Sequence, residues 1–214
     1  MTEPIAVIGA GGFGREVLDV IDAINDAHRA PVWNVVGVVD DSPSEVNLEQ
    51  LAKRRVRFLG SSDEFITSSS PVSYAVGIGS PSVRGRVSTR YDDAGFQAAT
   101  LIHPSATRGY GVDIGPGSVV CAGVRLTTNI QIGRHVHLNL NVTVGHDTVI
   151  EDNVSLNPSV TISGDCTIKA GVLVGSGAVV LNQLTVGRGS VVGGAACVVR
   201  DVPGGVVVKG VPAR

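Results

Sequence analysis

The chain has 214 residues, a formal net charge of −2 and no cluster of basic residues. This length allows one or two domains with a substantial core, and the near-neutral charge argues against a nucleic-acid or membrane-surface partner. No apolar stretch approaches the roughly eighteen residues that span a membrane without a glycine or a polar residue, so we expect a soluble cytoplasmic protein.

Residues 1–101 are predicted to form a small parallel α/β domain, because short apolar runs alternate with segments of helical periodicity. The first apolar run, at residues 4–9, ends in a glycine cluster and leads into a helix over residues 15–27. A second strand is expected at residues 33–39. Later strands are expected at residues 56–59, 72–78 and 96–101, and later helices at residues 48–54, 61–66 and 80–94.

The glycine cluster between the first strand and the first helix predicts a diphosphate site. Gly9, Gly11 and Gly14 fit the GxGxxG fingerprint, with Gly12 and Phe13 between them. Glycines let backbone N–H groups approach a pyrophosphate at the positive end of a helix. Since the rest of the chain lacks the second half of a dehydrogenase, we interpret the loop as a site for a nucleotide-linked substrate. Glycines needed only for tight packing, and nicotinamide binding, are the alternatives.

Two further strand ends can line the same crevice. Asp40 and Asp41 close the second strand, where their carboxylates can accept hydrogen bonds from ribose hydroxyls or a base edge. Gly79 ends a later strand, and Arg84 lies one turn into the helix that follows. An ordinary acidic loop and a solvated basic helix face are the competing interpretations.

Residues 102–203 repeat with a period of six. Every sixth residue from Ile102 to Val198 is aliphatic except Arg108. Such hexads are typical of a parallel β-solenoid in which three units close one triangular coil. The seventeen positions predict between five and six coils, about 27 Å tall at a strand spacing of about 4.8 Å.

Both ends of a solenoid need covering. We expect the α/β domain to cover the first coil, and the tail at residues 204–214 to cover or extend the last. The three cysteines, Cys121, Cys166 and Cys197, are widely spaced without a CxxC pair, which predicts reduced, space-filling thiols.

The stretch NLNVTVGHDTV holds the most promising catalytic residues of the solenoid. His146 is followed by Asp147 and preceded by Asn139, and Gly164 lies eighteen residues, or one coil, after the histidine. A glycine at that place leaves room for the imidazole and exposes a backbone N–H. A histidine on a solenoid corner is otherwise an ordinary solvated residue.

Taken together, the motifs GAGGFGREV, VVDD, GIG, IHPSA and GHD, the hexads and the ending GVPAR resemble the NeuD/PglD family of sugar acyltransferases over essentially the whole chain. The resemblance implies a left-handed β-helix, a homotrimer, a nucleotide-sugar on the α/β domain and acetyl-CoA between neighbouring subunits. It implies that His146 is the general base, that Asp147 orients it, and that Asn139 lies near the reacting groups.

The resemblance also implies acetyl-CoA contacts at Gly164 and Gly194. This sequence departs from the family in two places. Phe13 stands where family members often have a histidine in the glycine loop, and a second histidine common in the next coil is replaced near Ser155 and Asn157. These departures concern the contacts to the sugar and to acetyl-CoA.

The resemblance implies transfer of acetyl from acetyl-CoA, without a metal, to the amine of a nucleotide-linked 4-amino-4,6-dideoxy sugar in glycan biosynthesis. An imidazole with a pKa near neutrality suits the removal of the amine proton. UDP, dTDP and GDP are all compatible with the sequence. The alternatives are O-acetylation of a sialic acid or another sugar, a non-catalytic nucleotide-sugar-binding scaffold, and a carbonic anhydrase of the γ class with zinc on His135, His137 and His146.

Overall fold

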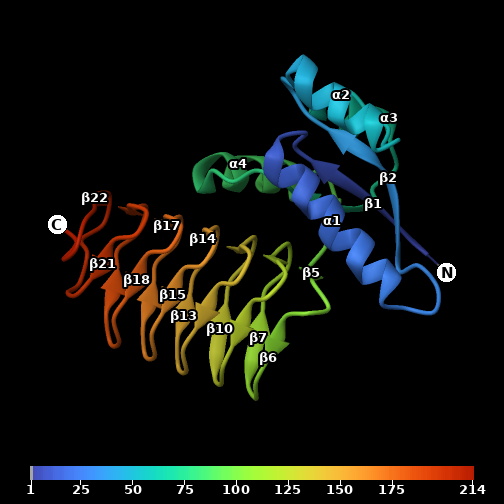
Figure 1. Ribbon diagram of the computed structural model, residues 1–214. Helices are drawn as coiled ribbons and strands as arrows, with labels where there is room; N and C mark the ends of the chain where they lie inside the picture. Colours follow the sequence, from blue (N-terminus) through green and yellow to red (C-terminus); the bar gives the residue numbers. More distant parts are fainter. Residues whose placement is uncertain (1) are drawn as a thin grey trace.

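The computed structural model describes residues 2–214, which form an α/β domain followed by a parallel β-helix (Figure 1). This is the predicted fold class, a small Rossmann-like parallel α/β unit and a left-handed parallel β-helix of hexapeptide repeats. Among residues 2–214, no helix is both long and apolar enough to cross a lipid bilayer.

The α/β domain has one four-stranded parallel sheet in the order β2-β1-β3-β4. Its strands are β1 (Glu3–Ile8), β2 (Trp33–Val39), β3 (Ser73–Val76) and β4 (Gln97–Ala98), and its helices are α1 (Gly12–Asp26), α2 (Glu45–Lys53), α3 (Ser62–Ser68) and α4 (Pro81–Asp93). Alternate residues of β1 face opposite sides of the sheet. Ile5 and Val7 pack with α1, whereas Ala6 and Ile8 pack with Tyr74 in a second core cluster.

Two expected strands differ from the prediction. Residues 56–59 make only an isolated bridge from Phe58 to Val38, in which the N–H of Val38 donates to the carbonyl of Arg57 and the N–H of Leu59 donates to the carbonyl of Val38. Residues 96–101 divide between the two parts of the molecule. β4 ends at Ala98, and the N–H of Leu101 already donates to the carbonyl of Ser118 in the β-helix.

The β-helix has three flat faces of parallel strands. The first face contains β5 (Leu101–Ile102), β8 (Val119–Val120), β11 (His137–Leu138), β14 (Ser155–Leu156), β17 (Leu173–Val174), β20 (Val191–Val192) and β22 (Val207–Val208). The second face contains β6 (Thr107–Arg108), β9 (Arg125–Leu126), β12 (Thr143–Val144), β15 (Thr161–Ile162), β18 (Val179–Val180) and β21 (Cys197–Val198). The third face contains β7 (Val112–Ile114), β10 (Ile130–Ile132), β13 (Val149–Ile150), β16 (Thr167–Ile168) and β19 (Thr185–Val186).

The hexad aliphatics form the column that the repeat predicts. Leu138 pairs in register with Val120 on one side and Leu156 on the other, and all three are fully buried. All three cysteines are free thiols, as expected; Cys121 and Cys166 are buried, and Cys197 is partly exposed.

The first coil of the β-helix is left uncovered by the α/β domain, whereas the C-terminal tail packs on the last coil. Arg108 is exposed in β6, in the first coil, where a charged residue can be hydrated. The α/β domain does not cover this end as expected. It packs on the first face instead, since α1 shares a core cluster with Leu101, Val119 and Cys121. At the other end the tail extends the column through β22, and Ala213 is buried against the last coil.

Candidate active site

His146 and Asp147 form a hydrogen-bonded pair at the corner between the second and third faces. The imidazole Nδ1 lies 2.7 Å from Asp147 Oδ2, and the histidine side chain is 62% exposed. Hydrogen bonds from His146 and then Asn129 hold the pKa of Asp147 below its usual value. An ionised carboxylate can only accept, so Nδ1 carries the proton and Nε2 is left as the acceptor. A ring in this tautomer can take a proton from an approaching group.

Asn129 is the member of this site that the sequence reasoning missed. Its Nδ2 donates to Asp147 Oδ1 at 3.1 Å, so the two carboxylate oxygens have different partners. Asn129 lies eighteen residues before Asp147, one coil earlier in the same corner. Counting one coil backward as well as forward would have found it.

Gly164 lies directly against the imidazole, as the one-coil spacing predicted. A Cβ at this glycine would fall 2.5 Å from His146 Nε2. Among the hydrogen bonds made within residues 2–214, none uses the N–H of Gly164. The ring therefore has space only because this residue is glycine, and a free donor lies beside it.

Other candidates lie at a different corner, between the first and second faces. Asn139 is buried there and donates through Nδ2 to the carbonyl of Leu156 at 2.9 Å. Asn157 and Gly194 follow β14 and β20 at the same corner. Within one chain the structure therefore does not bring Asn139, Asn157 or Gly194 to the corner of His146.

The expectation that Ser155 contacts acetyl-CoA does not fit its position. Its side chain is buried between the domains, where the hydroxyl donates to the carbonyl of Gly79 and accepts from Arg84, both at 2.9 Å. Because this hydroxyl is buried and already used as both donor and acceptor, a cofactor cannot reach it.

Arg84 is likewise an interdomain contact and not an open substrate ligand. The guanidinium is fully buried, and burial lowers its pKa to about 9. Its acceptors are the carbonyls of Ile78, Gly79, His135, Asn153 and Val154 and the hydroxyl of Ser155. These six acceptors occupy all five N–H groups of an arginine, so none is free for a ligand.

The glycine loop separates into structural and open positions. Gly9 has a φ of 114°, and a Cβ at Gly14 would overlap the carbonyl of Gly9, so both glycines are required by packing. A Cβ at Gly11, Gly12 or Gly79 would meet nothing within 4 Å. The tight-packing explanation therefore accounts for only part of the motif, and the open glycines are where a ligand can approach.

Of the two aspartates after β2, Asp40 supports this loop and Asp41 supports the start of α3. Asp40 accepts the N–H of Ala10 through Oδ2 at 2.7 Å and the N–H of Ser42 through Oδ1 at 2.8 Å. Asp41 accepts the N–H of Ser62 at the start of α3 at 2.6 Å. Both carboxylates thus hold backbone segments around the expected crevice.

The loop and His146 lie on opposite sides of the β-helix. The ring of Phe13 packs on that of His137, with centroids 4.5 Å apart, and His137 belongs to the first face. The corner that carries His146 joins the second and third faces, opposite the first. A single chain cannot present both groups to one small substrate.

The zinc alternative does not fit this arrangement. His135 and His137 are buried under the α/β domain, and His146 is exposed at the far corner. Within residues 2–214 no group of three or more metal-ligating side chains comes together.

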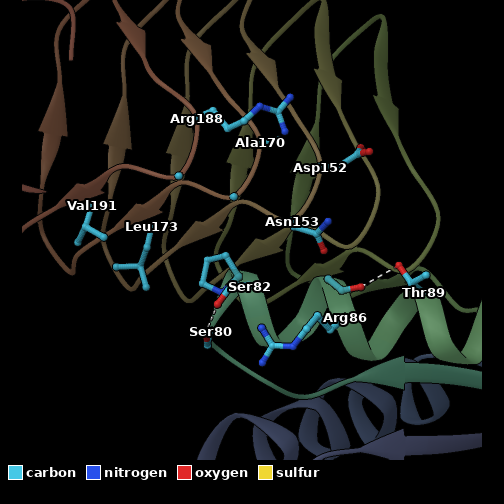
Figure 2. Close-up of a pocket in the computed structure, with 14 residues that line it drawn as sticks. Ser80, Ser82, Arg86, Thr89, Asp152, Asn153, Ala170, Leu173, Arg188 and Val191 are labelled. Atoms are coloured by element: carbon cyan, nitrogen blue, oxygen red, sulfur yellow. Dashed lines mark hydrogen bonds between the residues drawn. The ribbon is translucent and has the colours of Figure 1, made fainter. Parts of the chain in front are cut away.

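A cleft of about 840 Å³ separates α4 from the β-helix, as Figure 2 shows. Its lining includes Ser80, Ser82 and Arg86 of the α4 region and Arg188 and Leu173 of the β-helix. None of the predicted site residues lines it. The predicted site residues that the structure brings together are instead His146, Asp147 and Gly164, at the exposed corner between the second and third faces.

Comparison with known proteins gives one family match and several relatives. Residues 4–91 match the family described as PglD N-terminal domain. The chain is 30% identical over 149 residues to GDP-perosamine N-acetyltransferase of Escherichia coli O157:H7, an alignment that covers 68% of this chain. It spans 63% of that relative, less than two thirds of its length.

Two solved structures resemble both domains. PerB from Caulobacter crescentus, in complex with CoA and GDP-perosamine, is 27% identical with a TM-score of 0.86, and the match covers 99% of this chain and 96% of that one. The acetyltransferase domain of PglB from Neisseria gonorrhoeae is 29% identical with a TM-score of 0.87, covering 100% and 99%.

Fold and site together define a two-domain protein in which a PglD-type α/β domain packs against the first face of a hexapeptide-repeat β-helix. The matches confirm the resemblance to the NeuD/PglD family of sugar acyltransferases that the sequence motifs indicated.

Proposed function

We propose that this protein is an acetyl-CoA-dependent N-acetyltransferase that acts on the amine of a nucleotide-linked 4-amino-4,6-dideoxy sugar. The observation that carries the proposal is the exposed imidazole whose Nδ1 is held by Asp147 and whose Nε2 is free. The names of the relatives, which include a GDP-perosamine N-acetyltransferase and a complex with CoA and GDP-perosamine, support it and favour GDP as the nucleotide.

In the proposed reaction the sugar amine attacks the thioester carbonyl carbon of acetyl-CoA. His146 Nε2 takes the proton that the nitrogen loses as the C–N bond forms, and Asp147 stabilises the resulting imidazolium. The free N–H of Gly164 donates to the developing oxyanion. Collapse of the tetrahedral intermediate breaks the C–S bond, releases CoA as a thiol after proton transfer, and leaves the N-acetylated sugar.

The proposal includes a trimer with shared sites. The separation of the glycine loop and Asn139 from the His146 corner supports shared sites, because a neighbouring copy could bridge that distance, and the number of copies is taken from the resemblance. By the resemblance, acetyl-CoA would bind in that gap, near Asn157, Gly164 and Gly194. A monomeric mass in solution would contradict this part of the proposal.

The test is acetyl-CoA consumption by wild type and by His146→Ala with GDP-, UDP- and dTDP-linked 4-amino-4,6-dideoxy sugars. We expect turnover with one of these sugars, and a kcat about 10²- to 10⁴-fold lower in the variant. The melting temperature of the variant should match that of wild type, because the side chain is exposed. Near-normal turnover by His146→Ala would exclude the histidine as the base.

A further inference from the structure

The carboxylate that orients His146 is itself oriented from the preceding coil. Asp147 is about half exposed, so packing alone does not fix the rotation of its side chain. Its Oδ2 accepts from His146 Nδ1 at 2.7 Å and its Oδ1 accepts from Asn129 Nδ2 at 3.1 Å. With two directional contacts, one on each oxygen, the plane of the carboxylate is defined.

The backbone supports the same arrangement. Asn129 and Asp147 both have left-handed φ values, 54° and 57°, at equivalent places in successive coils. The two coils are connected there by the N–H of Asp147, which donates to the carbonyl of Thr128 at 3.1 Å. Asparagine tolerates this backbone conformation better than most residues and also supplies the amide donor.

We propose that Asn129 is a positioning residue for acetyl transfer, which holds Asp147 in the orientation that keeps the proton on His146 Nδ1 and leaves Nε2 free to act as the base. This inference rests on the proposed function. Asn129 acts only through Asp147, one coil removed from the reacting atoms.

The informative substitution is Asn129→Gly, because glycine keeps the left-handed backbone and removes only the amide. Asn141→Gly is the matched control. Asn141 is also exposed and has a φ of 59°, and its side chain makes no hydrogen bond within residues 2–214. We expect Asn129→Gly to lower kcat about 5- to 20-fold with little change in KM, because the lost hydrogen bond is solvent-exposed and acts on the base only through Asp147. Asn141→Gly should stay within about twofold of wild type.

A double-mutant cycle isolates the route of action. In an Asp147→Gly background, Asn129→Gly should change kcat by less than about twofold, because the acceptor of the Asn129 amide is already gone. An undiminished effect in that background would overturn the inference, as would wild-type kcat in Asn129→Gly alone.

A spectroscopic readout separates this inference from the proposed function. In ¹⁵N spectra of the histidine rings, wild type and Asn141→Gly should show neutral His146 mainly protonated at Nδ1, and Asn129→Gly should shift population to the Nε2-protonated tautomer. An unchanged tautomer ratio would refute the role of Asn129 even if His146 is the base. If Asn129→Gly changes the tautomer ratio but His146→Ala keeps normal turnover, the positioning role of Asn129 stands. In that case the proposed function of His146 is refuted instead.

Discussion

At the scale of single residues, the site depends on the absence of a side chain at Gly164. The sequence spacing already placed this glycine beside His146, and the structure shows that the ring fills the space a Cβ would take. The contact between His146 and Asp147, which are adjacent in the chain, could likewise be predicted. Asn129 was not found because its contact with Asp147 exists only when two coils are stacked.

Gly164→Ala is expected to lower kcat about 10- to 100-fold, because displacing a catalytic group by about 1 Å can cost about that much. Gly164 does not have a left-handed φ, so alanine adds no backbone strain and the fold should persist. The rate of single-turnover acetyl transfer checks the expected loss of activity, and the melting temperature checks that the fold persists. Wild-type turnover would show that the imidazole need not occupy its present position.

At the scale of elements, the turn between β1 and α1 combines packing and recognition. The GxGxxG pattern predicted the turn but did not tell structural glycines from open ones. Gly14 is restricted by the carbonyl of Gly9 inside the same loop, whereas Gly9 is also restricted by the carbonyl of Gly77, which follows β3 in a distant part of the sequence. A pattern within one loop contains no information about such a neighbour.

Gly12→Ala and Gly14→Ala should therefore behave in opposite ways. Gly12 opens α1 with free space around it, so alanine should leave the melting temperature unchanged or slightly higher. The KM for the nucleotide sugar should rise about tenfold or more, since the added methyl group occupies the space through which a pyrophosphate approaches the backbone N–H groups, and one hydrogen bond to a charged group is worth about 1.5–3 kcal/mol. Gly14→Ala should instead destabilise the protein by more than about 1 kcal/mol, because its Cβ overlaps the carbonyl of Gly9. Thermal melting and GDP titration of both variants distinguish these outcomes, and equal melting temperatures would contradict the assignment.

At the scale of the whole molecule, the contact between the domains buries two histidines. Burial lowers the pKa of His135, and burial and then the Arg84 cation hold the pKa of His137 well below its usual value. Both rings are therefore neutral in the folded protein, whereas the unfolded chain binds protons below about pH 6.5. The stability contributed by these rings is complete above that pH and is lost as the pH falls toward the lower folded-state pKa values.

Unfolding by urea should thus require less denaturant at about pH 5.5 than at about pH 7.5. His137→Phe keeps an aromatic ring against Phe13 but removes one titrating group, so its midpoint should fall less between the two pH values. An identical pH dependence in the variant would show that His137 does not report on the domain contact. The exposed His146 is the same in both proteins and cancels in the comparison.

The sequence by itself determined the two-part architecture, the column of aliphatic residues and the pairing of His146 with Asp147 and Gly164. These features repeat at fixed spacings, so local periodicity contains them. Only the tertiary structure decided that the α/β domain lies on the side of the β-helix, that Arg84 and Ser155 are buried in that contact, and that the glycine loop faces away from His146. Those outcomes depend on which faces of two separate cores meet, and no spacing along one segment specifies how two segments dock.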